Sequence, residues 1–125
     1  MISGTITSAR EGILILTVFD QQGQKHRIKA VIDTGFDGWL TLPPSFIATL
    51  SLLTKRTGQA ILADGSMILT NIYEMTVEWD EQEIRLAVDE VNAMPLVGMS
   101  LMYGYELIMP ILDGATFTLK SIDNR

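Results

Sequence analysis

Most of the chain alternates apolar and polar residues with a period of two, which is typical of β-strands with one buried face. The first such runs cover residues 5–7, 13–19 and 25–32, and a turn containing Gly23 joins the second run to the third. The third run ends in the apolar residues Ala30, Val31 and Ile32. We therefore expect a hairpin followed by a third strand that enters the core.

The middle of the chain predicts one short helix and two further hairpins. Pro43 and Pro44 can begin the helix, because proline lacks the N–H group that would be unpaired there. Apolar residues then follow at helical spacing: Phe46, Ile47, Leu50 and Leu53. Extended runs follow at residues 59–62, 67–73 with its continuation to 79, and 83–91. The Asp64-Gly65 pair between the first two runs is a strong hairpin signal.

The last third predicts a single helical turn over residues 99–103 and two strands, over residues 106–111 and 116–119, around Asp113-Gly114. The sequence contains no internal repeat, linker or low-complexity stretch. Many short strands with regular turns are typical of a closed or sandwiched β structure. We expect an all-β fold and one domain spanning residues 1–125.

Composition and charge restrict the function classes. The chain has 125 residues, of which 47% are hydrophobic and 19% charged, so intrinsic disorder is disfavoured. The net charge of -6 would repel phosphate groups, so we expect neither nucleic acid nor an anionic membrane as a partner. With no cysteine and a single histidine, His26, the chain has no disulfide, no cysteine nucleophile and no Cys- or His-rich metal site. We expect His26 to be exposed to solvent.

The N-terminal residues carry no targeting signal. The first residues lack the basic segment and the long apolar stretch of a signal peptide. The longest apolar run of the strand region, residues 13–16, is far too short to span a bilayer. We therefore expect a soluble protein of a reducing, cytoplasmic compartment.

One segment contains a candidate for chemistry, because the apolar run that ends at Ile32 leads directly into Asp33, Thr34 and Gly35. A carboxylate at the end of a buried strand is costly unless it is hydrogen-bonded or shared. The small residues after it allow a tight turn that brings N–H groups to the carboxylate. On its own the tripeptide is also compatible with an ordinary turn that Asp33 merely caps.

A second motif, Leu96-Val97-Gly98, comes 65 positions after Asp33 (98 minus 33) and precedes the predicted helical turn. The ordered set is Asp-Thr-Gly, a hairpin, apolar-apolar-Gly and a short helix. This set resembles the retroviral-type aspartic proteases (retropepsins) and their small bacterial relatives with a single Asp-Thr-Gly. The resemblance extends from about Lys25 to Met109. It implies a retropepsin-like closed β-barrel with one or two short helices.

The resemblance implies a role for each matching residue. Asp33 matches the catalytic aspartate, of which each chain supplies one. Thr34 matches the residue that hydrogen-bonds across the dimer axis, and Gly35 matches the glycine whose carbonyl contacts the substrate backbone. The residues that match the flap tip over the substrate are Ala63, Asp64, Gly65 and Ser66. The residues that match the loop packed behind the aspartate turn are Leu96, Val97 and Gly98.

Such a protease needs two carboxylates that share one proton. Because this chain has one Asp-Thr-Gly, the second Asp33 must come from a second copy in a twofold dimer. The resemblance thus implies a homodimeric aspartic endopeptidase that takes a peptide or protein substrate, cleaves extended peptides near apolar side chains and needs no cofactor or metal. The alternative is an inactive module that keeps the fold for peptide binding or dimerisation.

The chain departs from the retroviral pattern in three places. Met99 stands where those proteases carry an arginine that pairs with an acid at the position of Asp37. The tip has Gly65 as its one glycine, so we expect a stiffer flap. The chain also continues beyond Ile111 into the hairpin around Asp113-Gly114, which bears on the termini from which the family builds its dimer sheet.

Overall fold

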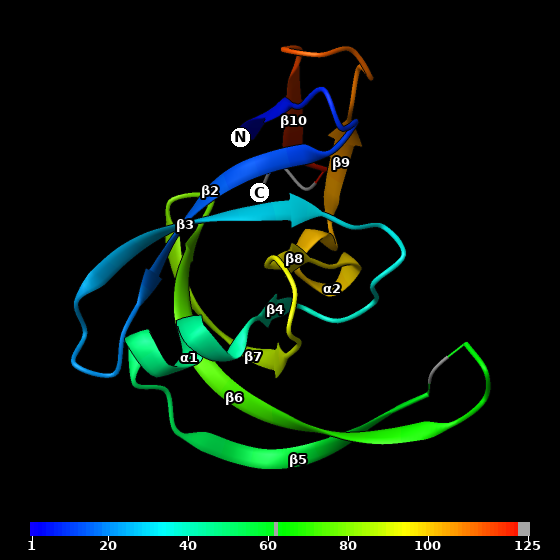
Figure 1. The fold of residues 1–125 in the computed structure, drawn as a ribbon. Coiled ribbons are helices and arrows are strands. Elements are labelled where there is room, and N and C mark those ends of the chain that lie inside the picture. Colours follow the sequence, from blue (N-terminus) through cyan, green and yellow to red (C-terminus); the bar gives the residue numbers. More distant parts are fainter. Residues whose placement is uncertain (62, 123–125) are drawn as a thin grey trace.

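The computed structural model describes residues 1–61 and 63–122. Two short helices occur in these ranges, α1 (Pro44–Leu50) and α2 (Met99–Met102). The strands in these ranges are β1 (Ile2–Ile6), β2 (Gly12–Phe19), β3 (Lys25–Ile32), β4 (Leu40–Leu42), β5 (Thr54–Ile61), β6 (Met67–Trp79), β7 (Gln82–Glu90), β8 (Leu96–Val97), β9 (Tyr105–Ile108) and β10 (Thr116–Ser121). All of these strands belong to a single sheet, in which neighbouring strands have the order β5-β6-β7-β4-β8-β3-β2-β1-β10-β9. Figure 1 shows the arrangement.

Six of these strands close into a barrel. Around the ring, each strand is hydrogen-bonded to the next in the order β2, β3, β8, β4, β7 and β6. The ring closes where β6 pairs with β2, with Val18 opposite Val77. The β3–β8 and β4–β7 pairs are parallel, and the other neighbours in the ring are antiparallel. The predicted all-β closed barrel is therefore confirmed.

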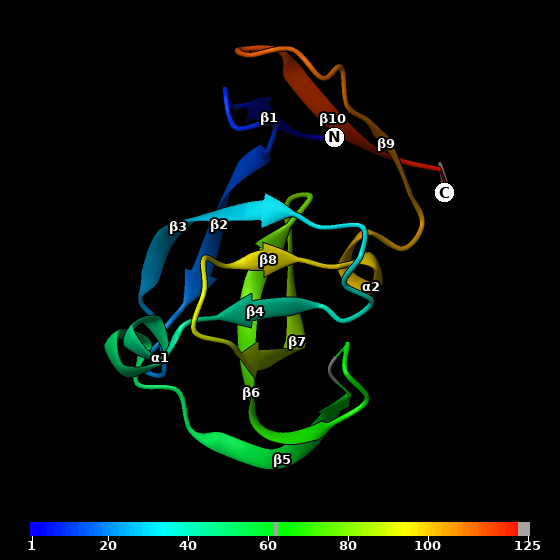
Figure 2. The same ribbon diagram turned by 45° about the vertical axis from the view of Figure 1, so that its right-hand side comes forward.

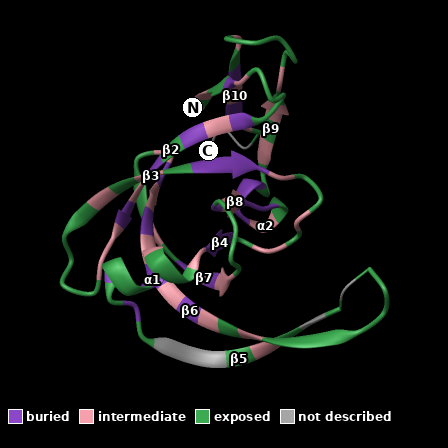
Figure 3. Cartoon of the chain, in the orientation of Figure 1, coloured by how far each residue is buried: buried purple, intermediate pink, exposed green. Residues whose placement is uncertain are grey.

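Alternation along the strands fills the barrel with apolar side chains. On β2, Leu14, Leu16 and Val18 are buried, while Ile15 between them is exposed. On β6, Met75 and Val77 are buried against them. Figure 3 shows the same alternation of buried and less buried positions along β2 and β6. A period-two pattern with one apolar face is thus what closes the sheet around its core.

The β5–β6 hairpin extends outside the ring. Strand β6 is 13 residues long, and only its C-terminal part pairs with β7, from Ile72 to Trp79. Its N-terminal part pairs with β5 alone, with Met67 opposite Ile61. Figure 2 shows this hairpin projecting from the barrel below β4 and β7.

The C-terminal strands add a second extension to the ring. Strand β10 pairs with β1 of the same chain, with Ile2 opposite Leu119, and β9 pairs with the other side of β10. The predicted strand over residues 106–111 ends earlier, at Ile108, and Pro110 follows it without an N–H group to donate. The hairpin around Gly114 therefore builds a sheet within one chain.

Other boundaries also differ from the expectation. Helix α1 ends at Leu50 because Ser51 adopts a left-handed conformation (φ 56°), so Leu53 lies outside the helix and is exposed. Strands β4 and β8 were not expected. They have three and two residues, and their partners lie far away in the sequence.

Candidate active site

Asp33 follows the last residue of β3 and opens a tight turn. Its backbone N–H donates to the carbonyl oxygen of Val97 at 2.9 Å, which extends the β3–β8 pairing by one residue. Its carboxylate Oδ1 accepts the backbone N–H of Gly35 at 2.8 Å. The side chain is half-buried. The turn thus fixes one carboxylate oxygen, as expected of an Asp-x-Gly turn, and Asp33 stays partly open to solvent.

The turn is held in place because β8 lies between β3 and β4. The chain leaves β3 at Asp33 and must cross the end of β8 before it enters β4. At this crossing, Gly98 N–H donates to Trp39 O at 3.0 Å, and Met99 N–H donates to Phe36 O at 2.8 Å. The two predicted motifs, 65 positions apart in the sequence, are therefore brought together by backbone hydrogen bonds.

Gly98 is the closest point of this crossing. A Cβ atom at this position would overlap the carbonyl oxygen of Gly38 and the ring of Phe36. The Gly38 oxygen belongs to the backbone and cannot rotate away. The φ of Gly98, -99°, is open to any residue, so backbone conformation does not require glycine here. Close packing requires it.

Leu96 and Val97 lie behind the turn and have different surroundings. Val97 is fully buried and pairs with both Ile32 and Leu40. Leu96 is half-buried, and its N–H donates to the hydroxyl of Thr41 at 2.9 Å. Thr41 was missed by the sequence analysis. Its only signal was a hydroxyl residue between two leucines, and it is 2% exposed.

Ser100 was also missed, and it supplies contacts at the position where the chain lacks an arginine. Its Oγ donates to the carbonyl oxygen of Asp37 at 2.6 Å, and its N–H donates to Gly38 O at 3.0 Å. The start of α2 is thus bound, through backbone carbonyls, to the loop between β3 and β4, residues 33–39, which we call the aspartate loop. Met99, which stands at the arginine position, has an exposed side chain.

The predicted flap tip has a turn geometry of its own. Oδ1 of Asp64 accepts both the N–H of Ser66 (2.9 Å) and its hydroxyl (2.6 Å), and the hydroxyl bond is the main reason why the pKa of Asp64 is lowered. Gly65 has a φ of 87°, which glycine adopts without strain. The described residues of the tip, 63–66, are exposed, and the hydrogen bonds of Asp64 lie within the tip itself. Leu62, beside them, lies outside the described residues.

A groove separates the base of the hairpin from the aspartate loop. It has a volume of about 290 Å³. Three groups of residues line it. The aspartate loop and its neighbours contribute Phe36, Thr41 and Leu96, and the β5–β6 hairpin contributes Gly58, Gln59, Thr70 and Ile72. The end of β7 and the residue after it contribute Asp89 and Val91. The lining thus combines the apolar side chains of Phe36, Leu96 and Ile72 with hydroxyl, amide and carboxylate groups.

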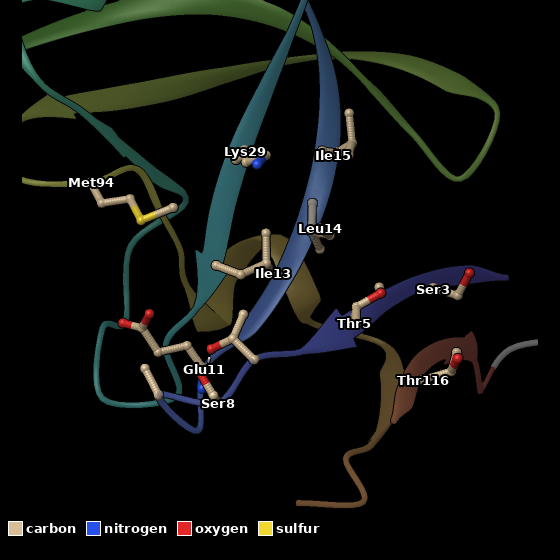
Figure 4. Close-up of a pocket in the computed structure, with 13 residues that line it drawn as sticks. Ser3, Thr5, Ser8, Glu11, Ile13, Leu14, Ile15, Lys29, Met94 and Thr116 are labelled. Carbon is tan, nitrogen blue, oxygen red and sulfur yellow. Dashed lines mark hydrogen bonds between the residues drawn. The ribbon is translucent and has the colours of Figure 1, made fainter. Parts of the chain in front are cut away.

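A larger hollow than this groove lies elsewhere, on the surface formed by β1, β2 and β3. Its volume is about 720 Å³, and Figure 4 shows Ser3, Thr5, Ile13, Ile15 and Lys29 around it. None of the predicted site residues lines it. It is a broad surface hollow without a cluster of groups for acid–base chemistry, so we place the candidate site at Asp33.

His26 and Asp20 are partners in a hydrogen bond away from the candidate site. His26 is half-buried, and its Nε2 lies 2.8 Å from Oδ2 of Asp20, so the expectation that His26 is simply exposed is wrong. This hydrogen bond is the main reason why the pKa of Asp20 is lowered.

Among the described residues, no three His, Asp or Glu side chains gather as a metal site would require. No helix in residues 1–61 and 63–122 is long and apolar enough to cross a membrane.

Comparison with known proteins gives one kind of similarity. No protein-family model matches the chain, and no curated protein matches it. Among solved structures, the chain is similar to EIAV protease complexed with the inhibitor HBY-793, at 17% sequence identity and a TM-score of 0.52. The similarity covers 76% of this chain and 88% of the viral one. The chain therefore has a retropepsin-like fold, whereas its resemblance to the small bacterial relatives remains a prediction.

Proposed function

We propose that the chain is one half of a homodimeric aspartic endopeptidase in which each copy contributes Asp33. The observation that carries this proposal is the turn at Asp33 within a retropepsin-like barrel. The carboxylate is oriented by the N–H of Gly35 and stays half-buried at the end of a core strand. A carboxylate that only capped a turn would need neither the crossing with β8 nor the close packing at Gly98.

In the proposed reaction, two Asp33 carboxylates lie close enough to share one proton, because two like charges at that range cannot both be ionised. The ionised carboxylate accepts a proton from a water molecule, and the water oxygen attacks the scissile carbonyl carbon. The protonated carboxyl group donates its proton to the carbonyl oxygen. Collapse of the resulting tetrahedral diol, with proton transfer to the amide nitrogen, breaks the C–N bond and releases an acid and an amine.

The substrate of the proposed enzyme is an extended peptide with apolar side chains. The groove between the β5–β6 hairpin and the aspartate loop supports this choice, because Phe36, Ile72 and Leu96 offer apolar surface there. Peptides bound in an extended form also use backbone hydrogen bonds, which a projecting hairpin can supply.

The test is a peptide-library digest with the wild-type protein and two matched variants. Asp33→Asn keeps the shape of the side chain but cannot share the proton, so we expect cleavage to fall at least about a thousandfold. Asp37→Asn makes the same chemical change four residues away on the exposed part of the loop and should retain most activity. Near-normal cleavage by a folded Asp33→Asn protein would refute the mechanism. Peptide binding without cleavage by the wild type would instead favour the inactive module.

A further inference from the structure

We propose that the hollow on β1, β2 and β3 is a docking site for another protein, and that it binds an extended segment of that protein in which acidic residues adjoin an apolar one. The hollow is separate from the groove beside the aspartate loop, so this inference goes beyond the proposed peptidase and does not depend on it. Three features of the described residues carry it, namely two strands that separate, a row of cationic side chains, and exposed apolar side chains beside that row.

The hollow lies where β1 and β2 separate. Within the described residues, the pairing of these strands ends at Thr5 opposite Ile13. Ile6, next to Thr5, donates its N–H to the turn before β10, so the backbone groups of Thr5 and Ser3 face β2 instead. One further pair would join Ser3 to Ile15, but the strands have diverged and both residues line the hollow. The backbone groups that would form this pair therefore face the hollow, where an extended segment can bind them.

Cationic side chains lie along the β3 side of the hollow. Lys25, Arg27 and Lys29 are exposed and alternate with less exposed residues, so they form a row on the outer face of β3. Nζ of Lys25 is paired with Oε1 of Glu78 at 2.8 Å. Among the described residues, neither Arg27 nor Lys29 forms an ion pair, and Lys29 lines the hollow. On a chain with a net charge of -6, this row is a local site of attraction for carboxylates.

Glu11 gives the hollow a direction. It also lines the hollow, and Figure 4 shows Glu11 and Lys29 at opposite ends, with Ile13 between them. Ile15 lies opposite Lys29 in the β2–β3 register, and Glu11 precedes Ile15 by four residues. That spacing is about 13 Å along a strand. The acidic residues of a bound segment are therefore attracted at the Lys29 end and repelled at the Glu11 end.

Apolar side chains beside the cationic row favour a protein segment over a simple anion. Ile13, Ile15 and Met94 line the hollow, and Ile15 is 45% exposed and Met94 43% exposed. The volume of about 720 Å³ lies within the range of roughly 300–1,000 Å³ that is typical of ligand sites. A phosphate ion would use Lys29 but neither the apolar side chains nor the separated strands. An extended peptide with an acidic and an apolar residue uses all three.

The test uses a fluorescein-labelled hexapeptide that alternates Ile and Thr in one half and carries Glu and Asp in the other half, made in both orders. A matched peptide carries Gln and Asn in place of the two acids. Fluorescence anisotropy with the full chain measures the Kd of each peptide. We expect the acidic peptide, in one of its orders, to bind at least about tenfold more tightly than its amide match, and this advantage to shrink as salt is added.

Variants of the chain test the placement, with circular dichroism to verify folding. Lys29→Glu should weaken binding of the acidic peptide at least about tenfold, and Lys29→Arg should retain it. Ile15→Thr keeps a β-branched side chain on the strand but removes apolar contact, so it should weaken binding of both peptides about threefold. Lys120→Glu makes the same change in charge at an exposed lysine outside the lining of the hollow and should bind as the wild type does.

A loss in Lys29→Glu, with binding retained in Lys29→Arg and Lys120→Glu, supports the inference. Equal binding of the acidic and amide peptides, equal losses in Lys29→Glu and Lys120→Glu, or no binding at millimolar peptide would overturn it. If the chain self-associates without peptide in sedimentation velocity, and Lys29→Glu abolishes that association, the hollow binds a second copy and the assignment to another protein is wrong. Because none of these measurements depends on cleavage, their failure would leave the proposed peptidase unaffected.

Discussion

The close packing at Gly98 allows a prediction whose size follows from the structure. In Gly98→Ala, the added methyl group would overlap the backbone carbonyl of Gly38. Relief requires the aspartate loop and β8 to move apart, which weakens three backbone hydrogen bonds across the crossing, donated by Gly98, Met99 and Ser100. Each contributes about 1 kcal/mol net. Forcing a methyl group into a well-packed region costs a further 1–3 kcal/mol or so.

The predicted loss in the free energy of unfolding is therefore about 4–6 kcal/mol if all three bonds are lost, a large part of the roughly 5–15 kcal/mol typical of a domain. Urea denaturation followed by circular dichroism measures this loss as a lower midpoint at an unchanged slope. Activity should fall with it, because the loop that moves is the one that orients Asp33.

Gly104→Ala is the matched control. Gly104 has a left-handed φ of 87° but nothing within 4 Å of the added methyl group, so its cost should be limited to about 1 kcal/mol of backbone strain. If Gly98→Ala lowers stability by no more than Gly104→Ala, the β8 crossing does not hold the aspartate loop in the way we infer.

Three further predictions concern the flap, the acid range and the dimer. Gly65 has a φ of 87° and open space around it, so Gly65→Val should raise the KM for a peptide clearly while the melting temperature falls little. A loss of stability that accounts for the whole loss of activity would mean that the hairpin does not contact the substrate. The pKa of Asp20 is lowered in the folded protein by the hydrogen bond from His26, so the stabilisation exists above its unfolded value of 3.8 and disappears as pH falls through the folded value. Asp20→Asn should therefore lower the urea midpoint at pH 6, and a gap that persisted at pH 2 would contradict this linkage. Peptidase activity should be bell-shaped with an acid optimum, at about pH 4 to 6, and should rise more steeply than protein concentration at high dilution; a plateau above neutral pH that is insensitive to pepstatin-like inhibitors would exclude the shared-proton mechanism.

The strands whose neighbours lie close in the sequence could be predicted from the sequence. The β2–β3 hairpin, with its turn at Gly23, follows from alternation and one glycine. The turn of the β5–β6 hairpin follows from Asp64-Gly65 in the same way, although β5 begins at Thr54, earlier than the predicted run over residues 59–62. In such cases the local pattern and the final pairing agree, so periodicity is sufficient.

Strands β4 and β8 could not be predicted, because a pattern of two or three residues has no recognisable period. Leu40–Leu42 and Leu96–Val97 become strands only through partners from distant parts of the chain. The motif Leu96-Val97-Gly98 was recognisable from the resemblance, but its contacts through Thr41 and Ser100 were not. A single hydroxyl residue in an apolar setting gives no signal until the fold brings its acceptor or donor close.

The insertion of β8 between β3 and β4 also determines the order in which the chain can assemble. The β2–β3 hairpin closes over a short loop, and such closures are fast. The turn at Asp33 has local hydrogen bonds of its own, but it gains its partners on β8 and α2 only when residues 96–100, more than 60 positions later, have docked. Closing so long a loop carries a higher entropic cost, so this crossing forms late in folding. During synthesis, Asp33 therefore leaves the ribosome long before the chain that orients it, and a nascent or truncated chain carries the acidic residue without an ordered site.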